Sequence, residues 1–394
     1  MSTVGIDIGA YQHVAAVCSE GASKAERKVL RIETRRSGFN ELDRWLERQN
    51  PVSLVVMESS GHYWLSLASH LRRRGVPFAV VNPLEAKYFA KSRLQRSKSD
   101  PADARTLAAL GMRDRPTPRD VLAGAELREA SRFAMKLVQQ QAEICQRIRR
   151  LIDLGFPELQ DEYDDPTCLS ALAILDTAPT ARDAARKHVA TLAKARTHRG
   201  GRPVGEVRAA RLHAAAQTSV APPELANQIS FQMRILLDEY SMLESHIALA
   251  EKRLRDLLDS ELSRRLQTIP GVGPAIAATL IAEIGEITRF DDVDQLLAYA
   301  GVHPKEQSSG KKGADPETSW TMAKTGNAYL RTAAYRMAVV GVQHNPLITA
   351  HYQRKRAQGK SKMNALGHCM GKALAIVWGV WRGGGDFDPS GRLH

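Results

Sequence analysis

The apolar and polar positions divide the chain into an alternating front part and a long helical remainder. Up to about residue 120, short runs typical of strands alternate with amphipathic stretches of helical period. The strand-like runs are VGIDIG, HVAAVCS, KVLRIET, SLVVMES and PFAVVNP, and the helical stretches are GFNELDRWLERQ and GHYWLSLASHLRRRG. This order predicts hairpin strands followed by parallel crossovers, which is an α/β layer fold.

Two long amphipathic stretches, residues 127–156 and 222–262, dominate the middle of the chain. Their apolar stripes predict helices that pack together or across subunits as a coiled coil. The basic segment 194–213 between them reads either as a loop that a polyanion orders or as a solvated linker. We therefore expect three domains, an α/β domain (1–120), a helical coiled-coil region (121–265) and a C-terminal domain (266–394).

Composition narrows the choice of partner. Lys and Arg number 56 against 43 Asp and Glu, and the net charge of +13 favours a polyanion such as nucleic acid. No stretch approaches the roughly 20 apolar residues of a membrane-spanning helix, so we expect no membrane partner. The four cysteines are scattered without metal-ligand spacing, which fits a reducing cytoplasm.

Asp7 lies on a strand face that carries almost no other side chain. Strand alternation places it between Gly5 and Gly9, with apolar residues on the opposite face. The two glycines leave room for a bulky group to approach the carboxylate. A single acid on a solvated face explains the same pattern, so Asp7 alone does not define a site.

Three more carboxylates occur at the ends of predicted elements. Glu58 ends the buried strand SLVVM, at the edge where α/β sheets usually place active sites. In SKSDPADARTLA, Asp100 precedes Pro101 and Asp103 follows, a pattern that predicts a helix start. A purely structural alternative is that Asp100 caps this helix and Asp103 complements its dipole.

The four acids together favour a metal site over separate structural roles. Clustered carboxylates repel one another unless cations lie between them. Mg²⁺ prefers oxygen ligands, and two ions about 4 Å apart can assist both the attacking and the leaving oxygen in phosphodiester chemistry. We therefore predict that Asp7, Glu58, Asp100 and Asp103 bind one or two Mg²⁺ ions.

A glycine turn marks the start of the last region. In IPGVGPAIAATLI, Gly271 and Gly273 lead into a helix whose first amides suit a backbone phosphate. The pattern is similar to half of a helix-hairpin-helix, although a plain turn between packed helices fits the spacing equally well. Lys324 and Arg331, on a predicted helix downstream, are further candidate nucleic-acid contacts.

Several motifs resemble one known family. The segments GIDIGAYQHVAAV, VVMESSGHYW, VVNPLEAKYFAKS, SKSDPADARTLA, IPGVGPAIAATLIAEIG, LLAYAGVHPKEQSSGKKG and AKTGNAYLRTAAYRMA resemble the DEDD transposases of the IS110 insertion-sequence family, relatives of the Piv-type DNA invertases. The resemblance covers both ends of the chain, and the basic insert near 194–213 departs from the shorter members. It implies an RNase H-like (RuvC-like) domain that carries the four acids and a separate, mainly helical C-terminal transposase domain.

The resemblance also implies a serine nucleophile and an RNA partner. The match to AGVHPKEQSSGKKG places the nucleophile at Ser309, with Ser308 as the alternative, and Lys311 and Lys312 could offset phosphate charge beside it. The loop holds no evident base except His303, and a serine needs a base or a metal to act as a nucleophile. The resemblance implies that the acids and their Mg²⁺ come from the other domain, either of the same chain or of another subunit. A structured guide (bridge) RNA would pair with donor and target double-stranded DNA, and we expect a dimer or tetramer.

Three alternatives belong to other classes. GIDIGA also resembles the first phosphate loop of actin-like sugar kinases, but their second phosphate loop and adenosine site do not follow in this chain. A nonenzymatic nucleic-acid-binding protein would not need all four acids. A junction-resolving nuclease would need the acids but no serine. We expect a transposase that exchanges DNA strands through a serine.

Overall fold

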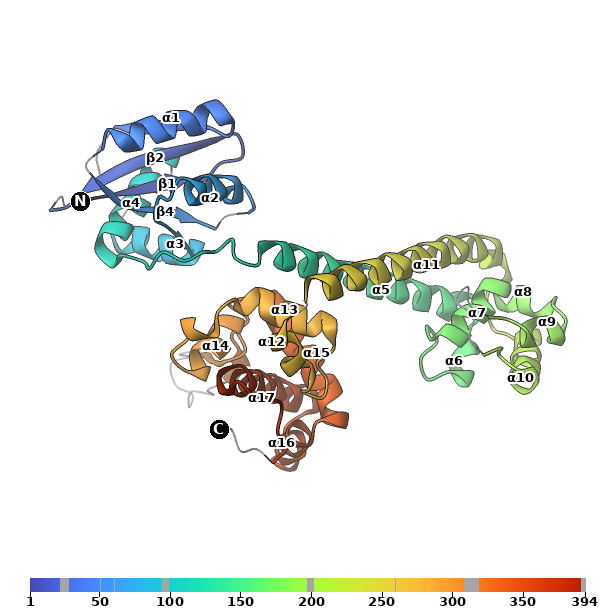
Figure 1. Cartoon of the computed structure of the whole chain (residues 1–394). Helices are drawn as coiled ribbons and strands as arrows, with labels where there is room; N and C mark the ends of the chain where they lie inside the picture. The colour runs from blue at the N-terminus through green and yellow to red at the C-terminus, as the bar shows by residue number, and fades with distance from the viewer. Residues whose placement is uncertain are drawn as a thin grey trace, which may run out of the picture. The chain divides into compact units, whose positions relative to one another are not determined.

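The computed structural model describes residues 1–394 except 22–27, 50, 60, 94–98, 197–201, 259, 308–318 and 391–394. The chain folds into two compact units, Met1–Ala125 and Glu126–His394. The first is a mixed α/β unit and the second is mostly helical (Figure 1). The α/β and helical character expected for the two parts of the chain is thereby confirmed.

The first unit is built on a five-stranded sheet. Its strands are β1 (Ser2–Asp7), β2 (Gln12–Ser19), β3 (Val29–Glu33), β4 (Val52–Glu58) and β5 (Phe78–Val81), in the order β3-β2-β1-β4-β5. The β1–β2 and β2–β3 pairs are antiparallel, and the β1–β4 and β4–β5 pairs are parallel. The predicted sequence of hairpins followed by parallel crossovers is therefore correct.

Helices cover both faces of this sheet. Apolar residues of α1 (Arg36–Glu47) and α2 (Trp64–Arg73) share one buried cluster with Val4 and Ile6 of β1. On the other face, α3 (Pro83–Ser92) and α4 (Asp100–Asp114) pack against β4 and β5 through a second cluster. Burial on both faces explains why β4 is a continuous apolar run.

Helix α4 lies directly on β1 because Gly5 has no side chain. A Cβ atom added at Gly5 would lie 2.1 Å from the Ala108 nitrogen and 2.2 Å from the Ala104 carbonyl oxygen. At the other end of the contact, a Cβ at Gly111 would meet the methyl groups of Thr3 and Val56 at 2.6 and 2.5 Å. The space predicted beside Gly5 is therefore filled by the backbone of α4.

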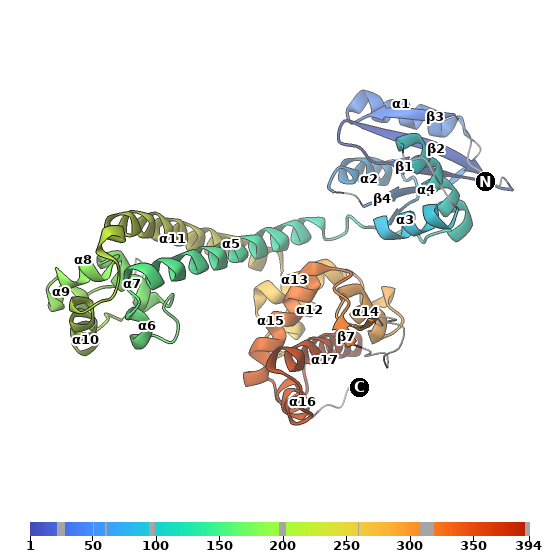
Figure 2. The ribbon, with the colours of Figure 1, turned by 180° about the vertical axis from the view of Figure 1, so that it is seen from behind.

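Two long antiparallel helices form the stem of the second unit. They are α5 (Ala125–Gly155) and α11 (Ala226–Leu257), and they lie side by side in both views (Figures 1 and 2). A Cβ atom added at Gly155 would lie 2.7 Å from a methyl carbon of Ile229. Near the opposite end of the helix pair, the Arg253 side chain donates a hydrogen bond to the Glu126 carboxylate. Residues from both helices share one buried cluster, so the two stretches pack together within one chain.

Short helices connect α5 to α11. They are α6 (Leu159–Glu162), α7 (Leu169–Thr177), α8 (Ala181–Ala185), α9 (Val189–Ala193), α10 (Glu206–Gln217) and the 3₁₀ turn η1 (Pro223–Leu225). The prediction of a loop or linker over residues 194–213 is wrong for its last part, because α10 begins at Glu206 and includes residues 206–213. Ala209 and Leu212 of this helix are fully buried, which gives the segment a hydrophobic reason to fold without a polyanion.

The rest of the second unit surrounds the long helix α17 (Lys362–Gly383). Its other helices are α12 (Glu261–Gln267), α13 (Pro274–Ile284), η2 (Ile287–Arg289), α14 (Val293–Ala300), α15 (Ala328–His344) and α16 (Pro346–Ala357). A two-stranded antiparallel ribbon, β6 (Pro304–Gln307) and β7 (Ser319–Met322), interrupts them. No helix in the described part of the chain is long and apolar enough to cross a membrane.

The Gly5 contact generates a test of the first unit. We expect Gly5→Ala to lower its free energy of unfolding by about 1 to 3 kcal/mol or more, because the added methyl group must displace the backbone of α4. Urea denaturation followed by circular dichroism measures the change. Gly385→Ala is the control, since a Cβ there meets no atom within 4 Å. An unchanged Gly5→Ala midpoint would show that α4 does not pack directly on β1.

Candidate active site

Asp7 and Glu58 are the last residues of neighbouring parallel strands. Ile6 of β1 pairs with Met57 of β4, so both acids follow this pair at the same edge of the sheet. This is the carboxyl edge, where chain segments leave a parallel sheet and side chains can converge. The sheet register therefore brings together two acids that are 51 positions apart in the sequence.

Helix α4 runs antiparallel to β1 and begins beside Asp7. Gly111 lies against Thr3 and the 104–108 turn lies against Gly5, so continuation of the two elements places the first turn of α4 alongside Asp7. Asp100 and Asp103 are both in that first turn. The packing at Gly5 is thus the reason why two acids of a distant segment reach the sheet edge.

Asp100 is not the N-cap of α4, which corrects the structural alternative weighed for it. Ser99 occupies the cap with an extended backbone (φ −159°, ψ 149°), and its carbonyl oxygen accepts from the amides of Ala102 and Asp103. Asp100 and Pro101 stand in the helix itself. Capping therefore does not account for the carboxylate of Asp100.

The pKa of Asp7 shows that the four acids interact. It is raised from 3.8 to about 7, mainly because burial disfavours the charged form and then because Asp103, Asp100 and Glu58 repel a further negative charge. A hydrogen bond from the Ile8 backbone amide acts in the opposite direction and lowers the pKa of Asp7. The structure thus brings together all four acids predicted from the sequence, close enough for their charges to act on one another.

This set of donors matches a hard divalent cation in charge and chemistry. Carboxylate oxygens are the ligands that Mg²⁺ prefers, and a cation would relieve the repulsion that raises the pKa of Asp7. Within the described residues, however, no group of three or more His, Cys, Asp or Glu side chains is arranged so that it could hold a metal ion. The carboxylates are neighbours but are not preassembled around one position.

The candidate serine lies outside the described residues. Ser308, Ser309, Lys311 and Lys312 all fall within 308–318, the segment that joins β6 to β7. The described flanks are held at backbone level, because Ala323 donates to the His303 carbonyl oxygen at 3.0 Å and Lys324 donates to Gly301 at 3.1 Å. The sequence did not predict this two-stranded ribbon.

The glycine turn connects α12 to α13 as the sequence indicates. Gly271 has φ of +99°, which favours glycine, and Gly273 is the N-cap of α13. A Cβ at Gly273 would meet no atom within 4 Å, so the start of this helix is open. Of the two downstream cations, only Arg331 lies on a helix. Lys324 is exposed and precedes α15, so its predicted helical position is wrong. Arg331 donates to the Ala300 carbonyl oxygen at 3.1 Å and so supports local structure.

A buried ionic cluster next to the ribbon was missed from the sequence. The side chain of Glu283 is 2% exposed and accepts two bonds from Arg132 of α5, at 2.6 and 2.9 Å. It also accepts a bond from the Asn327 side chain at 2.6 Å, and Asn327 caps α15 just after β7. The signal was one carboxylate in the otherwise uncharged helix PAIAATLIAEI. The cluster ties α5 to the segment that follows β7.

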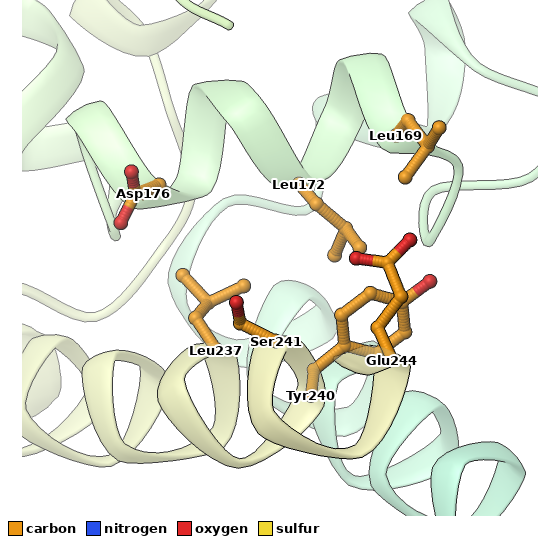
Figure 3. Close-up of a pocket in the computed structure, with 7 residues that line it drawn as sticks. All are labelled: Leu169, Leu172, Asp176, Leu237, Tyr240, Ser241 and Glu244. Atoms are coloured by element: carbon orange, nitrogen blue, oxygen red, sulfur yellow. The ribbon is translucent and has the colours of Figure 1, made fainter. Parts of the chain in front are cut away.

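A hollow between α7 and α11 has the wrong charge for nucleic acid. Leu172, Leu237 and Tyr240 line it, and Asp176 and Glu244 are the charged residues of its wall (Figure 3). Carboxylates at such a site repel phosphate. Nucleic-acid contacts are therefore to be sought elsewhere on the second unit.

Comparisons with known proteins match both ends of the chain. Residues 4–157 match the family model DEDD_Tnp_IS110, described as Transposase, and residues 263–353 match the model described as Transposase IS116/IS110/IS902 family. The first match spans the four acids and α5, and the second spans the glycine turn and the ribbon. The stretch between them includes α10 and all of α11.

Individual relatives match between 78% and 94% of the chain. The mini-circle putative transposase for IS117 of Streptomyces coelicolor is 27% identical over 94% of this chain and 91% of its own length. The insertion element IS110 uncharacterized 43.6 kDa protein of the same organism is 25% identical over 78% and 73%. The pilin gene-inverting protein of Moraxella bovis is 24% identical over 91% and 89%. The resemblance inferred from the motifs is confirmed.

The raised pKa of Asp7 predicts a pH-dependent stability. The folded state holds one proton more than the unfolded state between pH 3.8 and about 7, so the stability that Asp7 contributes is complete below pH 3.8 and is lost as the pH rises to about 7. Asp7→Asn removes the charge. We expect it to raise the free energy of unfolding at pH 8 by about 1 to 2 kcal/mol, an estimate reduced for partial exposure.

Urea denaturation at pH 5 and pH 8 without divalent cations measures this effect. The gain from Asp7→Asn should be larger at pH 8 than at pH 5. Asp256→Asn, which removes an exposed acid from α11, provides the control and should show no such difference. Equal effects of Asp7→Asn at both pH values would contradict the repulsion among the four acids.

Proposed function

Since the chain belongs to the IS110 family of transposases, we propose that it is a DNA recombinase that moves an insertion sequence by serine-mediated strand exchange. The family supports a DNA-cutting and DNA-recombining enzyme. The observation that carries the proposal is the meeting of Asp7, Glu58, Asp100 and Asp103 at one edge of the sheet. Neither a passive binding protein nor a sugar kinase needs this set of acids.

The architecture fits this proposal. The strand order, with two antiparallel pairs followed by two parallel pairs, agrees with an RNase H-like (RuvC-like) first domain. The antiparallel pair of α5 and α11 is consistent with a coiled coil. The short helix α12, the glycine turn and α13 are consistent with half of a helix-hairpin-helix, where Gly271 and Gly273 would admit a phosphate. We assign these parts to 1–120, 121–265 and 266–394.

The four acids would hold the divalent cation, which we propose to be Mg²⁺. When bound, one or two such ions would neutralise carboxylate charge and polarise phosphodiester oxygens. The chain itself fixes where the ligands come from, because β1 and β4 supply one acid each and the first turn of α4 supplies two. Rigid elements position such ligands better than loops do.

Ser309 is the proposed nucleophile, with Ser308 as the alternative. The serine Oγ would form a bond to a backbone phosphorus while one phosphorus–oxygen bond of the DNA breaks, and the departing oxygen takes up a proton. The new ester retains the bond that is needed for rejoining, so no nucleotide cofactor is consumed. Lys311 and Lys312 would offset phosphate charge, with Lys324 and Arg331 as further contacts.

The partners in this proposal are double-stranded donor and target DNA, a structured guide RNA and further copies of the chain. The guide RNA follows from the family resemblance, and the net charge of +13 is compatible with it.

We propose that the chain forms a dimer or tetramer, and light scattering of the complex with nucleic acid tests this oligomeric state. One protein chain per complex would refute that state. The family and its DNA substrates point to the cytoplasm.

A junction-resolving nuclease is the second candidate, because the four acids alone can support metal-assisted hydrolysis. Hydrolysis uses water and leaves a free phosphate end with nothing attached to the protein. The two candidates therefore differ in one product, a covalent protein–DNA linkage.

The acids are tested by alanine variants. Asp7→Ala, Glu58→Ala, Asp100→Ala and Asp103→Ala should each abolish recombination of plasmid substrates, because each removes an oxygen ligand, while duplex binding persists. Asp256→Ala is the control and should recombine normally. Since Ser99 rather than Asp100 caps α4, the Asp100 variant should also fold normally by circular dichroism. Full activity of the Asp7 and Glu58 variants would refute the metal site.

The serine is tested by trapping the covalent linkage. Wild-type protein mixed with end-labelled DNA and its co-purified RNA should give a protein–DNA adduct that survives denaturation, and ribonuclease treatment should prevent it. Ser309→Ala should give no adduct but should still bind. If Ser308→Ala loses the adduct instead, the neighbouring serine is the nucleophile. Normal recombination by both variants would exclude serine chemistry and favour the nuclease.

A further inference from the structure

The C-terminal part of the chain is strongly one-sided in charge. Residues 318–385 contain no Asp and no Glu. The same stretch contains ten basic residues, Lys324, Arg331, Arg336, Arg354, Lys355, Arg356, Lys360, Lys362, Lys372 and Arg382. Such a stretch has no acidic side chains of its own with which to neutralise these cations, so any neutralising partner must come from elsewhere.

Seven of these cations lie on α16, α17 or the turn between them. The two helices are joined by residues 358–361 and pack against each other, with the Cys369 sulfur 4.0 Å from the Ile348 carbonyl oxygen. Arg354 contacts His351 at 3.0 Å across one turn of α16. Arg356 reaches the carbonyl oxygen of Lys360 and so fixes the turn.

The seam between these helices collects positive charge. The pKa of His351 is lowered by burial and then by Arg354, Lys355, His368 and Lys372. The pKa of His368 is lowered by burial and then by Lys355 and Lys360. Lys355 of α16 therefore acts on both imidazoles, while Lys372 of α17 acts on His351 and Lys360 of the turn acts on His368. We call the set Lys355, Lys360, Lys372, His351 and His368 the α16–α17 basic seam.

No ion pair among the described residues involves a lysine of the basic seam or the neighbouring Arg354. Arg354 and Lys360 are exposed residues, and Lys355 and Lys372 are partly exposed. The aromatic residues of the two helices, Tyr352, Trp378 and Trp381, pack against the core instead of forming a platform for bases. The seam thus offers cations without stacking surfaces.

We infer that the α16–α17 basic seam binds the phosphodiester backbone of duplex nucleic acid. Exposed and partly exposed cations on two packed helices and their turn match phosphates, and the lack of exposed aromatic rings on these helices disfavours contacts to unpaired bases. The inference rests on the proposed function and adds to it a site on α16 and α17. DNA and RNA duplexes share this backbone, and the experiment distinguishes them.

The test compares two triple variants with the same change in net charge. Lys355→Gln, Lys360→Gln and Lys372→Gln together remove the lysines of the seam. The matched control combines Lys136→Gln, Lys187→Gln and Lys252→Gln, three exposed lysines elsewhere in the second unit. Binding to 30-bp duplex DNA and duplex RNA is measured between 50 and 300 mM salt, with thermal unfolding as the check on folding.

The seam variant should lose about 100-fold in duplex affinity near 0.15 M salt, and its log–log salt slope should become shallower by about 2.7, or 0.9 per lost contact. The control triple should change much less. Loss on DNA alone assigns the seam to DNA, loss on RNA alone assigns it to an RNA duplex, and loss on both shows that either backbone binds; each supports the inference.

Equal losses in the two triple variants, or no loss in either, would overturn the inference. The inference would also be overturned if the seam triple variant bound both duplexes normally but failed to bind phosphatidylserine vesicles, because that result would assign the seam to a membrane surface.

The proposed function is tested separately from the seam. If wild-type protein neither cuts nor recombines DNA, that function fails, whereas a normally binding seam triple in an active protein refutes the seam alone.

Discussion

The contact between the backbones of β1 and α4 at Gly5 is the constraint on which the candidate active site depends. A side chain at this position would hold the helix away from the strand. With the helix seated, its first turn lies beside the end of β1, and Asp100 and Asp103 act on Asp7. Glu58 needs no such device, because the parallel pairing of β1 with β4 sets its place. The site is therefore a consequence of close packing.

The alternation of apolar and polar residues was sufficient to predict the five strands, α1, α2 and both long helices. Helix α4 was predicted from its start signal, and α3 was not predicted. Val4 and Ile6 repeat with period two, and α5 and α11 carry apolar residues at helical spacing over about nine turns each. Local pattern failed at α10. The charged, glycine-containing residues before α10 are typical of a loop. Burial of Ala209 and Leu212 in the tertiary structure is what stabilises α10 as a helix.

The four acids could be predicted as a set because each stands at the end of an element, but their arrangement could not. The missing side chain at Gly5 was interpreted as room for a ligand, whereas the backbone of α4 occupies that room. Nothing in the local sequence distinguishes these two interpretations. Ser99 and Asp100 are both good caps, so the backbone alone decides between them. Glu283 was overlooked because its partners Arg132 and Asn327 are remote in sequence. The serine loop lies outside the described residues and stays a prediction.

The candidate active site and residues 318–385 carry opposite charge, and this difference bears on mechanism. Four carboxylates at a sheet edge repel a phosphodiester, so the first unit cannot attract DNA through its candidate site unless cations neutralise it. Residues 318–385, with ten cations and no acids, supply attraction without offering a metal ligand set. Affinity and chemistry would then reside in different units. On this view, loss of an acid removes strand exchange but not binding, and loss of seam lysines removes binding but leaves the acids in place.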